Sequence, residues 1–129
     1  FMPLYAGIPT QQQAQKLYDR LCQPDFSGTP AHPLYICPSY STQDEKFNPE
    51  KYWRGPVWIN MNWMLYHGLH RYGFHEKATR IKYDALELIS RYGFYEYFDP
   101  RKDTEEPKGY GTGHFSWSAA LCIDFLETE

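Results

Sequence analysis

Apolar residues recur at steps of three and four positions in four separate segments of this 129-residue chain. Such spacing places side chains on one face of an α-helix, so each segment is predicted to form a helix with one buried stripe. The expected helices span residues 11–22, 56–71 and 75–92, and a fourth begins at a cap on Ser116. No segment shows the two-residue alternation that is typical of a strand. The chain is therefore predicted to be all-α.

Local signals mark the ends of these helices. Thr10 and Gln13 form a capping box, in which the side chain of each residue bonds the backbone amide of the other. Pro56 suits the first position of a helix, where no amide donor is needed. Gly73 and Gly93 can adopt the left-handed conformation that closes a helix. Both glycines lie in copies of Arg-Tyr-Gly-Phe, so the second and third helices are expected to end alike.

Two long segments, residues 23–51 and 93–113, carry no helical or alternating period. The first opens with Pro24, which is expected to end the preceding helix. Loops of this length are uncommon inside compact domains unless they form a functional site. Helices joined alternately by short turns and long loops are what the hairpins of a helical toroid produce. An ordinary four-helix bundle is the alternative, but its connections usually have about two to eight residues.

Charge and hydropathy exclude several classes of partner. The net charge of -3 and the pI of about 5.9 provide no basic field for a phosphate backbone, so no nucleic-acid partner is expected. No apolar run approaches the roughly 20 residues that cross a bilayer, so no membrane span is expected. Three cysteines without a Cys-x-x-Cys pair argue against a disulfide framework and favour a reducing, cytoplasmic location.

Glu96 is the strongest catalytic candidate on local grounds. It follows a helix-closing glycine and stands among four aromatic residues in the run GFYEYFDP. Rings at this position could stack on a sugar, and a carboxylate beside them could take a proton from water as a general base. The alternative is a solvent-facing Glu whose neighbours pack elsewhere. Asp99 is the rival carboxylate, but its place before a proline favours a role in a turn.

A second aromatic group precedes the second helix, in the run YWRGPVW at residues 52–58. Tyr52, Trp53 and Trp58 could form a platform for a sugar ring. Arg54 could donate a fork of hydrogen bonds to hydroxyls or to a carboxylate. The alternative is that Trp58 begins the buried stripe of the helix and that Arg54 pairs with a structural acid.

No metal or cofactor is expected. His67 and His70 stand three positions apart on a helix, but no third ligand has suitable spacing for a metal. The run GYGTG at residues 109–113 lacks the preceding strand and the following lysine of a phosphate-binding loop, and is interpreted as a flexible loop edge. No serine lies in a nucleophile elbow.

Three blocks of the chain closely resemble successive blocks of glycoside hydrolase family 63 and its bacterial relatives, the mannosylglycerate and glucosylglycerate hydrolases, with a distant likeness to trehalase. They are YWRGPVWINMNWMLYHGL, GFYEYFDP and GHFSWSAALCIDFL. The resemblance implies an (α/α)6 toroid that hydrolyses an α-glucosidic or α-mannosidic bond with inversion. It implies that Glu96 is the general base, that Tyr52, Trp53, Arg54 and Trp58 contact the substrate, and that Trp117 lies near the sugar pocket.

The chain also departs from that family. The resemblance implies a general acid, an Asp beside a Trp in an earlier block, and no such block is present. The apolar opening is expected to lie inside a longer domain, so residues 1–129 are expected to be the C-terminal segment of an incomplete catalytic domain. The expected partners are a sugar substrate and either the missing N-terminal half or a second copy. The alternative functions are a non-catalytic carbohydrate-binding module and a helical interaction module.

Overall fold

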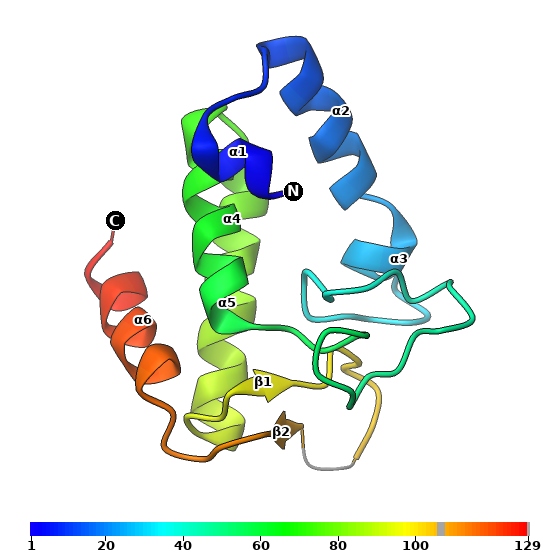
Figure 1. The fold of residues 1–129 in the computed structure, drawn as a ribbon, viewed down its shortest axis with the longest axis vertical. Helices are drawn as coiled ribbons and strands as arrows, with labels where there is room; N and C mark the ends of the chain where they lie inside the picture. Colours follow the sequence, from blue (N-terminus) through cyan, green and yellow to red (C-terminus); the bar gives the residue numbers. More distant parts are fainter. Residues whose placement is uncertain (106–107, 129) are drawn as a thin grey trace.

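The computed structural model describes residues 1–105 and 108–128. Within these ranges, the chain is mostly helical and also contains one small two-stranded sheet (Figure 1). The helices are α1 (Met2–Ala6), α2 (Gln11–Leu21), α3 (Pro24–Ser27), α4 (Ile59–Arg71), α5 (His75–Tyr92) and α6 (Ser116–Glu127). The strands are β1 (Tyr97–Phe98) and β2 (Gly109–Tyr110), which pair antiparallel. The prediction of a mainly helical chain is confirmed.

The hairpin of α4 and α5 forms the centre of the molecule. Helix α4 packs against α1, α5 and α6, and α5 also contacts α6. The four long helices alternate in direction along the chain, and the β1–β2 sheet lies at the end where α4 and α6 begin (Figure 1). Of the residues at three- and four-residue steps that predict the α5 stripe, Ala78, Ile81, Ala85 and Leu88 are buried and Tyr92 is half-buried. None of the described helices is both long and apolar enough to cross a membrane.

Most of the predicted helix ends are confirmed. The Thr10 hydroxyl accepts the Gln13 amide at 3.3 Å, and the Gln13 side chain accepts the Thr10 amide at 2.9 Å. Gly73 has a φ of 81°, and the amide of the next residue returns to the Leu69 carbonyl at 2.9 Å. These two features are those of a Schellman motif. Helix α5 has the predicted bounds, but the expectation that the two Arg-Tyr-Gly-Phe copies end their helices alike is wrong. Gly93 combines a φ of 90° with a ψ of -172°, which is not the left-handed helical conformation, and its own amide donates to the Ile89 carbonyl at 2.9 Å.

Two predicted helix starts are wrong. Helix α4 begins at Ile59 rather than at Pro56, because Val57 is extended and exchanges two backbone hydrogen bonds with Phe98, at 2.7 and 2.9 Å. Ser116 does not cap α6 but is its first residue. The cap position is occupied by Phe115, whose amide donates to the Phe94 carbonyl at 2.7 Å.

Several short elements were not predicted. Helix α1 lies on α4 at Gly68, where an added Cβ would come within 2.8 Å of the Leu4 carbonyl carbon. Pro24 begins the four-residue helix α3, besides following the end of α2. The expectation that no strand forms is wrong for β1 and β2, because two residues in each give too short an alternation to recognise in the sequence.

Helix α5 anchors both long loops through Asp84, whose side chain is only 6% exposed. Its carboxylate accepts the backbone amide of Ile36, from the first loop, at 2.9 Å. It also accepts the ammonium of Lys102, from the second loop, at 2.7 Å. Removing the Asp84 carboxylate would therefore weaken the attachment of both loops to α5, because the Ile36 amide and the Lys102 ammonium both bond to it.

The two loops also bond each other directly. The Tyr35 amide donates to the Pro100 carbonyl at 2.7 Å, and the Lys102 amide donates to the Pro33 carbonyl at 2.9 Å. The Lys102 ammonium lies 4.4 Å from the centre of the Tyr35 ring, within the range of a cation–π contact. The segment that follows β1 is thereby held against the first loop and against α5.

We expect Asp84→Ala to destabilise the protein by about 3 kcal/mol, because it leaves the buried Ile36 amide without its acceptor and removes the nearer of the two carboxylates that the Lys102 ammonium contacts. Asp19→Ala removes an exposed carboxylate that, among the described residues, accepts a hydrogen bond only from the Gln15 side-chain amide, and should cost less than about 0.5 kcal/mol. Urea unfolding followed by circular dichroism measures both changes. Equal stability of the two variants would show that the loops are held by other contacts.

Candidate active site

Four aromatic rings stack in sequence at the sheet end of the helices. Trp53 lies on Trp58 with ring centres 4.0 Å apart and planes at 8°. Trp58 lies on Tyr97 at 5.0 Å and 25°, and Tyr97 lies on Tyr110 at 6.2 Å and 24°. We call these four rings the aromatic stack. They come from the loop before α4 and from both strands of the sheet, so the Val57–Phe98 and β1–β2 pairings bring them together.

Tyr52 packs edge-on against the aromatic stack. Its ring centre lies 4.8 Å from that of Trp58 and 5.4 Å from that of Tyr97. The Tyr52 carbonyl accepts the Trp58 indole N–H at 3.0 Å. The backbone φ of Tyr52 is 38°, a left-handed value that a tyrosine rarely adopts and that surrounding contacts must hold in place.

Glu96 lies immediately beside the aromatic stack. It precedes Tyr97 in the chain, and its carboxylate accepts the Thr112 backbone amide at 3.3 Å. In the described part of the chain it has no other hydrogen bond or ion pair, so the remaining lone pairs of this half-buried carboxylate are free to accept a water molecule. Thr112 and the neighbouring Gly111 were not identified from the sequence, where they were interpreted as a flexible loop edge.

Burial and nearby negative charge raise the pKa values of the two tyrosines in the aromatic stack. Desolvation is the largest cause of the raised pKa of Tyr97, and the charge of Glu96 is the next. The pKa of Tyr110 is raised to about 12 by desolvation and then by the charges of Glu50 and Asp99. Tyr110 was not predicted as a site residue, because its place depends on strand pairing rather than on its neighbours in the sequence.

The other polar candidates are engaged in loop structure. The Arg54 guanidinium donates to the Lys46 carbonyl through Nε at 3.2 Å and through Nη2 at 2.9 Å, so it closes its own loop. Asp99 accepts the Arg101 amide at 2.8 Å and pairs with the Arg101 guanidinium at 2.7 Å. The turn role expected for Asp99 is therefore confirmed.

Trp117 occupies a separate hollow. Its side chain is 55% exposed, and among the described rings it contacts only Phe115, at 5.5 Å. With Asn60 and Trp63 of α4 it lines an open hollow of about 330 Å³ between α4 and α6. The structure therefore brings Tyr52, Trp53 and Trp58 together beside Glu96, but it places Trp117 across the first turn of α4.

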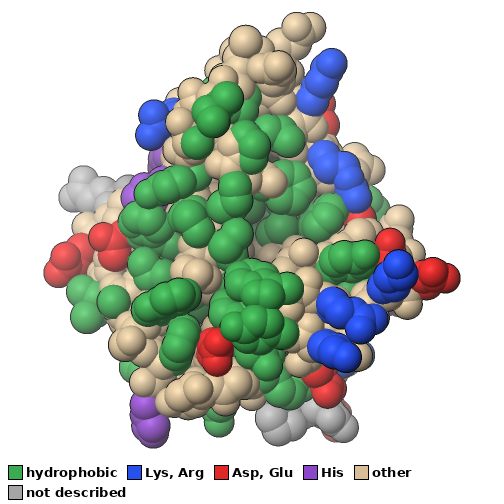
Figure 2. All heavy atoms as spheres, in the orientation of Figure 1, with side chains coloured by type: hydrophobic (Ala, Val, Ile, Leu, Met, Phe, Trp, Pro, Cys, Tyr) green, Lys and Arg blue, Asp and Glu red, His purple; other side chains and the backbone are tan. Residues whose placement is uncertain are grey.

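Trp53 and Trp58 also line a cleft of about 320 Å³, together with Phe1 and Met61. Hydrophobic side chains cover much of the face over α1 and α4, and this face is hollowed near its middle (Figure 2). An apolar wall with a few polar groups at its edge is typical of small-molecule sites. The cleft places the tryptophans in a setting that suits a sugar ring.

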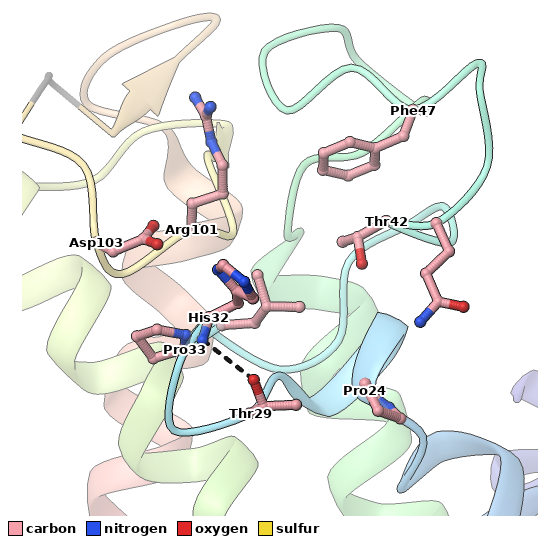
Figure 3. Close-up of a pocket in the computed structure, with 10 residues that line it drawn as sticks. Pro24, Thr29, His32, Pro33, Thr42, Phe47, Arg101 and Asp103 are labelled. Atoms are coloured by element: carbon pink, nitrogen blue, oxygen red, sulfur yellow. Dashed lines mark hydrogen bonds between the residues drawn. The ribbon is translucent and has the colours of Figure 1, made fainter.

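A further hollow of about 350 Å³ lies between the two long loops (Figure 3). Arg101 and Asp103 lie on one side of it, and Thr42 and Phe47 lie on the other. Arg101 is already paired with Asp99, and neither Glu96 nor any ring of the aromatic stack lines this hollow. It is therefore distinct from the site beside Glu96.

The two histidines of α4, His67 and His70, contact different partners and do not form a shared metal site. His70 lies 3.0 Å from His75 between their Nδ1 atoms, whereas His67 faces Asp124 at 3.8 Å. Burial and then the neighbouring His75 lower the pKa of His70. Within residues 1–105 and 108–128, no three His, Cys, Asp or Glu side chains gather as metal ligands would.

Comparisons with known proteins agree on one family. Residues 1–118 match the family described as the mannosylglycerate hydrolase MGH1-like glycoside hydrolase domain. The mannosylglycerate hydrolase of Thermus thermophilus is 45% identical over 123 residues, which make up 95% of this chain and 28% of that protein. The mannosylglycerate hydrolase of Rubrobacter radiotolerans is 40% identical over 126 residues, 98% of this chain and 27% of that protein.

The fold is similar to that of a solved relative. A crystal structure of the GH63 mannosylglycerate hydrolase from Thermus thermophilus in complex with glucose matches with a TM-score of 0.84 and 42% identity. The match covers 98% of this chain and 29% of that one. The predicted fold class, a part of an (α/α)6 toroid, and the resemblance to family 63 are confirmed. The chain spans little more than a quarter of the length of the curated relatives.

The raised pKa of Tyr110 predicts a loss of stability in alkali. The unfolded chain ionises this tyrosine near pH 10, but the folded chain does so only near pH 12. Stability is therefore present in full below pH 10 and falls as the pH rises from about 10 to 12. We expect Tyr110→Phe to lessen this fall, as measured by thermal melts across that range. An unchanged pH dependence would contradict the raised pKa that the half-buried setting gives Tyr110.

Proposed function

This chain belongs to the mannosylglycerate hydrolase MGH1-like family of glycoside hydrolases, and from that premise we propose that it supplies the general base of an inverting α-glycosidase. Glu96 is the base. The observation that carries the proposal is the position of its carboxylate, which lies beside the aromatic stack with one backbone amide as its only partner in the described residues. Such a carboxylate can orient a water molecule and accept its proton.

In an inverting reaction, water attacks the anomeric carbon on the face opposite the leaving group. As the water oxygen forms its bond to the anomeric carbon, the Glu96 carboxylate accepts one proton from this water, and the bond to the leaving oxygen breaks. A carboxylic acid elsewhere in the protein gives a proton to the departing oxygen, and the two carboxyl groups lie roughly 6.5–9.5 Å apart to admit the water. We propose that this acid comes from outside residues 1–129, which form a C-terminal segment of the catalytic domain.

The aromatic residues and Arg54 hold the substrate in this proposal. The exposed ring of Trp53 offers a flat face to a sugar ring, with Tyr52 at its edge, and Trp58 supports this platform because it is buried between Trp53 and Tyr97. Trp117 lines the separate hollow across the first turn of α4 and is proposed to contact a part of the substrate beyond that ring. The exposed Arg54 can exchange its contact with the Lys46 carbonyl for a hydroxyl or a carboxylate of the substrate. The substrate class is a small α-glucoside or α-mannoside, and no cofactor takes part.

The role of Glu96 is tested in the complete hydrolase that carries this segment. We expect Glu96→Gln to lower kcat by about a thousandfold or more, because the amide cannot accept the proton of the attacking water. Sugar binding, followed by quenching of tryptophan fluorescence, should remain. Glu45→Gln, in the loop before the aromatic residues, is the matched control and should leave kcat unchanged. Turnover that survives Glu96→Gln would refute the assignment.

The mechanism has its own readout. Proton NMR of the first product formed from an α-glycoside should show the β-anomer before it equilibrates, because an inverting enzyme delivers water to the opposite face. Initial release of the α-anomer would exclude inversion even if Glu96 proved essential.

The exposed face of α6 suggests that the isolated chain associates with other chains. Ile123 is 58% exposed and Leu126 is 67% exposed, and exposed apolar patches of this kind mark contact surfaces. We propose that the rest of the toroid covers this face, and that a second copy covers it when only residues 1–129 are present.

We expect light scattering to show self-association of the isolated chain at micromolar concentrations. The double variant Ile123→Gln and Leu126→Gln should reduce this association, since glutamine keeps the helix but removes its apolar surface. Tyr83→Gln removes a comparably exposed side chain from α5 and serves as the control. A monomeric wild-type chain would contradict the prediction.

A further inference from the structure

We propose that the backbone at Gly111 and Thr112 positions the Glu96 carboxylate, so that Gly111 is a positioning residue for the reaction. This inference rests on the proposed role of Glu96 as the general base. It assigns a function to the GYGTG run at residues 109–113, which is not explained by nucleotide binding or by the helical core.

The register of the sheet places Gly111 opposite Glu96. Phe98 pairs with Gly109, and Tyr97 pairs with Tyr110. Continuing the same antiparallel register by one residue brings Glu96 to Gly111, and directly opposed residues in such a ladder face each other at short range. The Glu96 side chain therefore lies against Gly111, which has no side chain of its own.

The space at Gly111 is filled mainly by Glu96, with the Tyr97 ring beside it. A Cβ added at Gly111 would lie 2.6 Å from Glu96 Oε2, 2.8 Å from Glu96 Cβ and 2.9 Å from Tyr97 Cε1, closer than real contacts allow. The φ of Gly111 is 74°, a left-handed value that suits glycine. The turn also points the next amide, that of Thr112, at the same carboxylate oxygen at 3.3 Å.

Both sides of this arrangement are held by further contacts. The Asp99 amide donates to the Lys108 carbonyl at 2.8 Å, just before the glycine run. On the other side, the Ser118 hydroxyl donates to the Tyr95 carbonyl at 2.6 Å, just before Glu96. The first turn of α6 thus fixes the backbone just before Glu96, and the glycine run fixes the carboxylate itself.

Positioning matters because a general base must point at a water molecule aligned for attack. A displacement of about 1 Å at a reacting group can lower the rate about a hundredfold. We therefore expect Gly111→Ala, in the complete hydrolase, to lower kcat by about a hundredfold and to leave KM within about threefold. Turnover is expressed per binding site, counted by titration with glucose, so that unfolded protein does not count as lost catalysis.

Two glycines serve as matched controls. In the described part of the chain, a Cβ added at Gly113 would meet only the Tyr95 ring, at 3.7 Å, and the φ of Gly113 lies outside the left-handed region, so Gly113→Ala should keep kcat. Gly73 shares the left-handed φ of Gly111, but none of the described residues has an atom within 4 Å of a Cβ added there. Gly73→Ala therefore reports the cost of backbone strain alone, in thermal melts and in kcat.

A double substitution separates positioning from a general structural role. In the Glu96→Gln background, Gly111→Ala should cause little further loss of the residual activity, because the group that it displaces is no longer a base. Where Gly111→Ala does not fold, Thr112→Pro removes the amide donor instead and should show the same pattern, with Thr112→Ala as its control.

The possible failures are distinguishable. If Glu96→Gln leaves turnover intact, the proposed function itself is wrong. If Glu96→Gln abolishes turnover but Gly111→Ala keeps kcat within about threefold, only the positioning inference is overturned. It is equally overturned if Gly111→Ala loses the same factor in both backgrounds, because that result describes a structural defect.

Discussion

The buried carboxylate of Asp84 is the constraint on which the rest of this structure depends. It accepts hydrogen bonds from the Ile36 amide of the first long loop and from the Lys102 ammonium of the second. It lies on α5, which is held in the core by its buried apolar side chains. The loops then bond each other through Tyr35 and Pro100, next to the point where Phe98 pairs with Val57. Since Val57 immediately precedes Trp58, this pairing determines where the tryptophan lies relative to β1. The site beside Glu96 is therefore built by loops that are anchored at a distance from it.

The aromatic stack converts this anchoring into local rigidity. The rings of Trp53, Trp58 and Tyr97 each have a stacked neighbour that restricts their motion. Tyr52 packs edge-on against Trp58, and its backbone adopts a left-handed φ to do so. Strained residues of this kind persist only where surrounding contacts determine them fully. Because Tyr97 is joined to Glu96 by one peptide bond, confining its ring also confines the backbone that carries the carboxylate.

Local signals in the sequence predicted what is locally determined. Helix α5 has its expected bounds because its apolar stripe and Gly93 act within a few residues of each other. The start of α4 was misplaced because Pro56 satisfies a local rule, whereas Val57 is held by Phe98, which is far along the chain. The same distinction applies to the site. Glu96 and its flanking rings were found from one short run and from the resemblance to a family, but Tyr110 and Gly111 acquire their places only through the register of β1 and β2.

The proposed inverting mechanism would explain how a segment that spans little more than a quarter of its relatives can build half of a site. The acid and the base must stand on opposite faces of the sugar, separated by the substrate and a water molecule. No direct contact between the two carboxyl groups is needed, so each can be organised by its own part of the chain. Here the contacts that order Glu96 and the aromatic stack arise within residues 52–58 and 95–118. In this proposal, Glu96 and the aromatic stack can therefore be ordered without the acid. The rest of the toroid would then add the second carboxyl group at the right distance and a cover for the apolar faces of the helices.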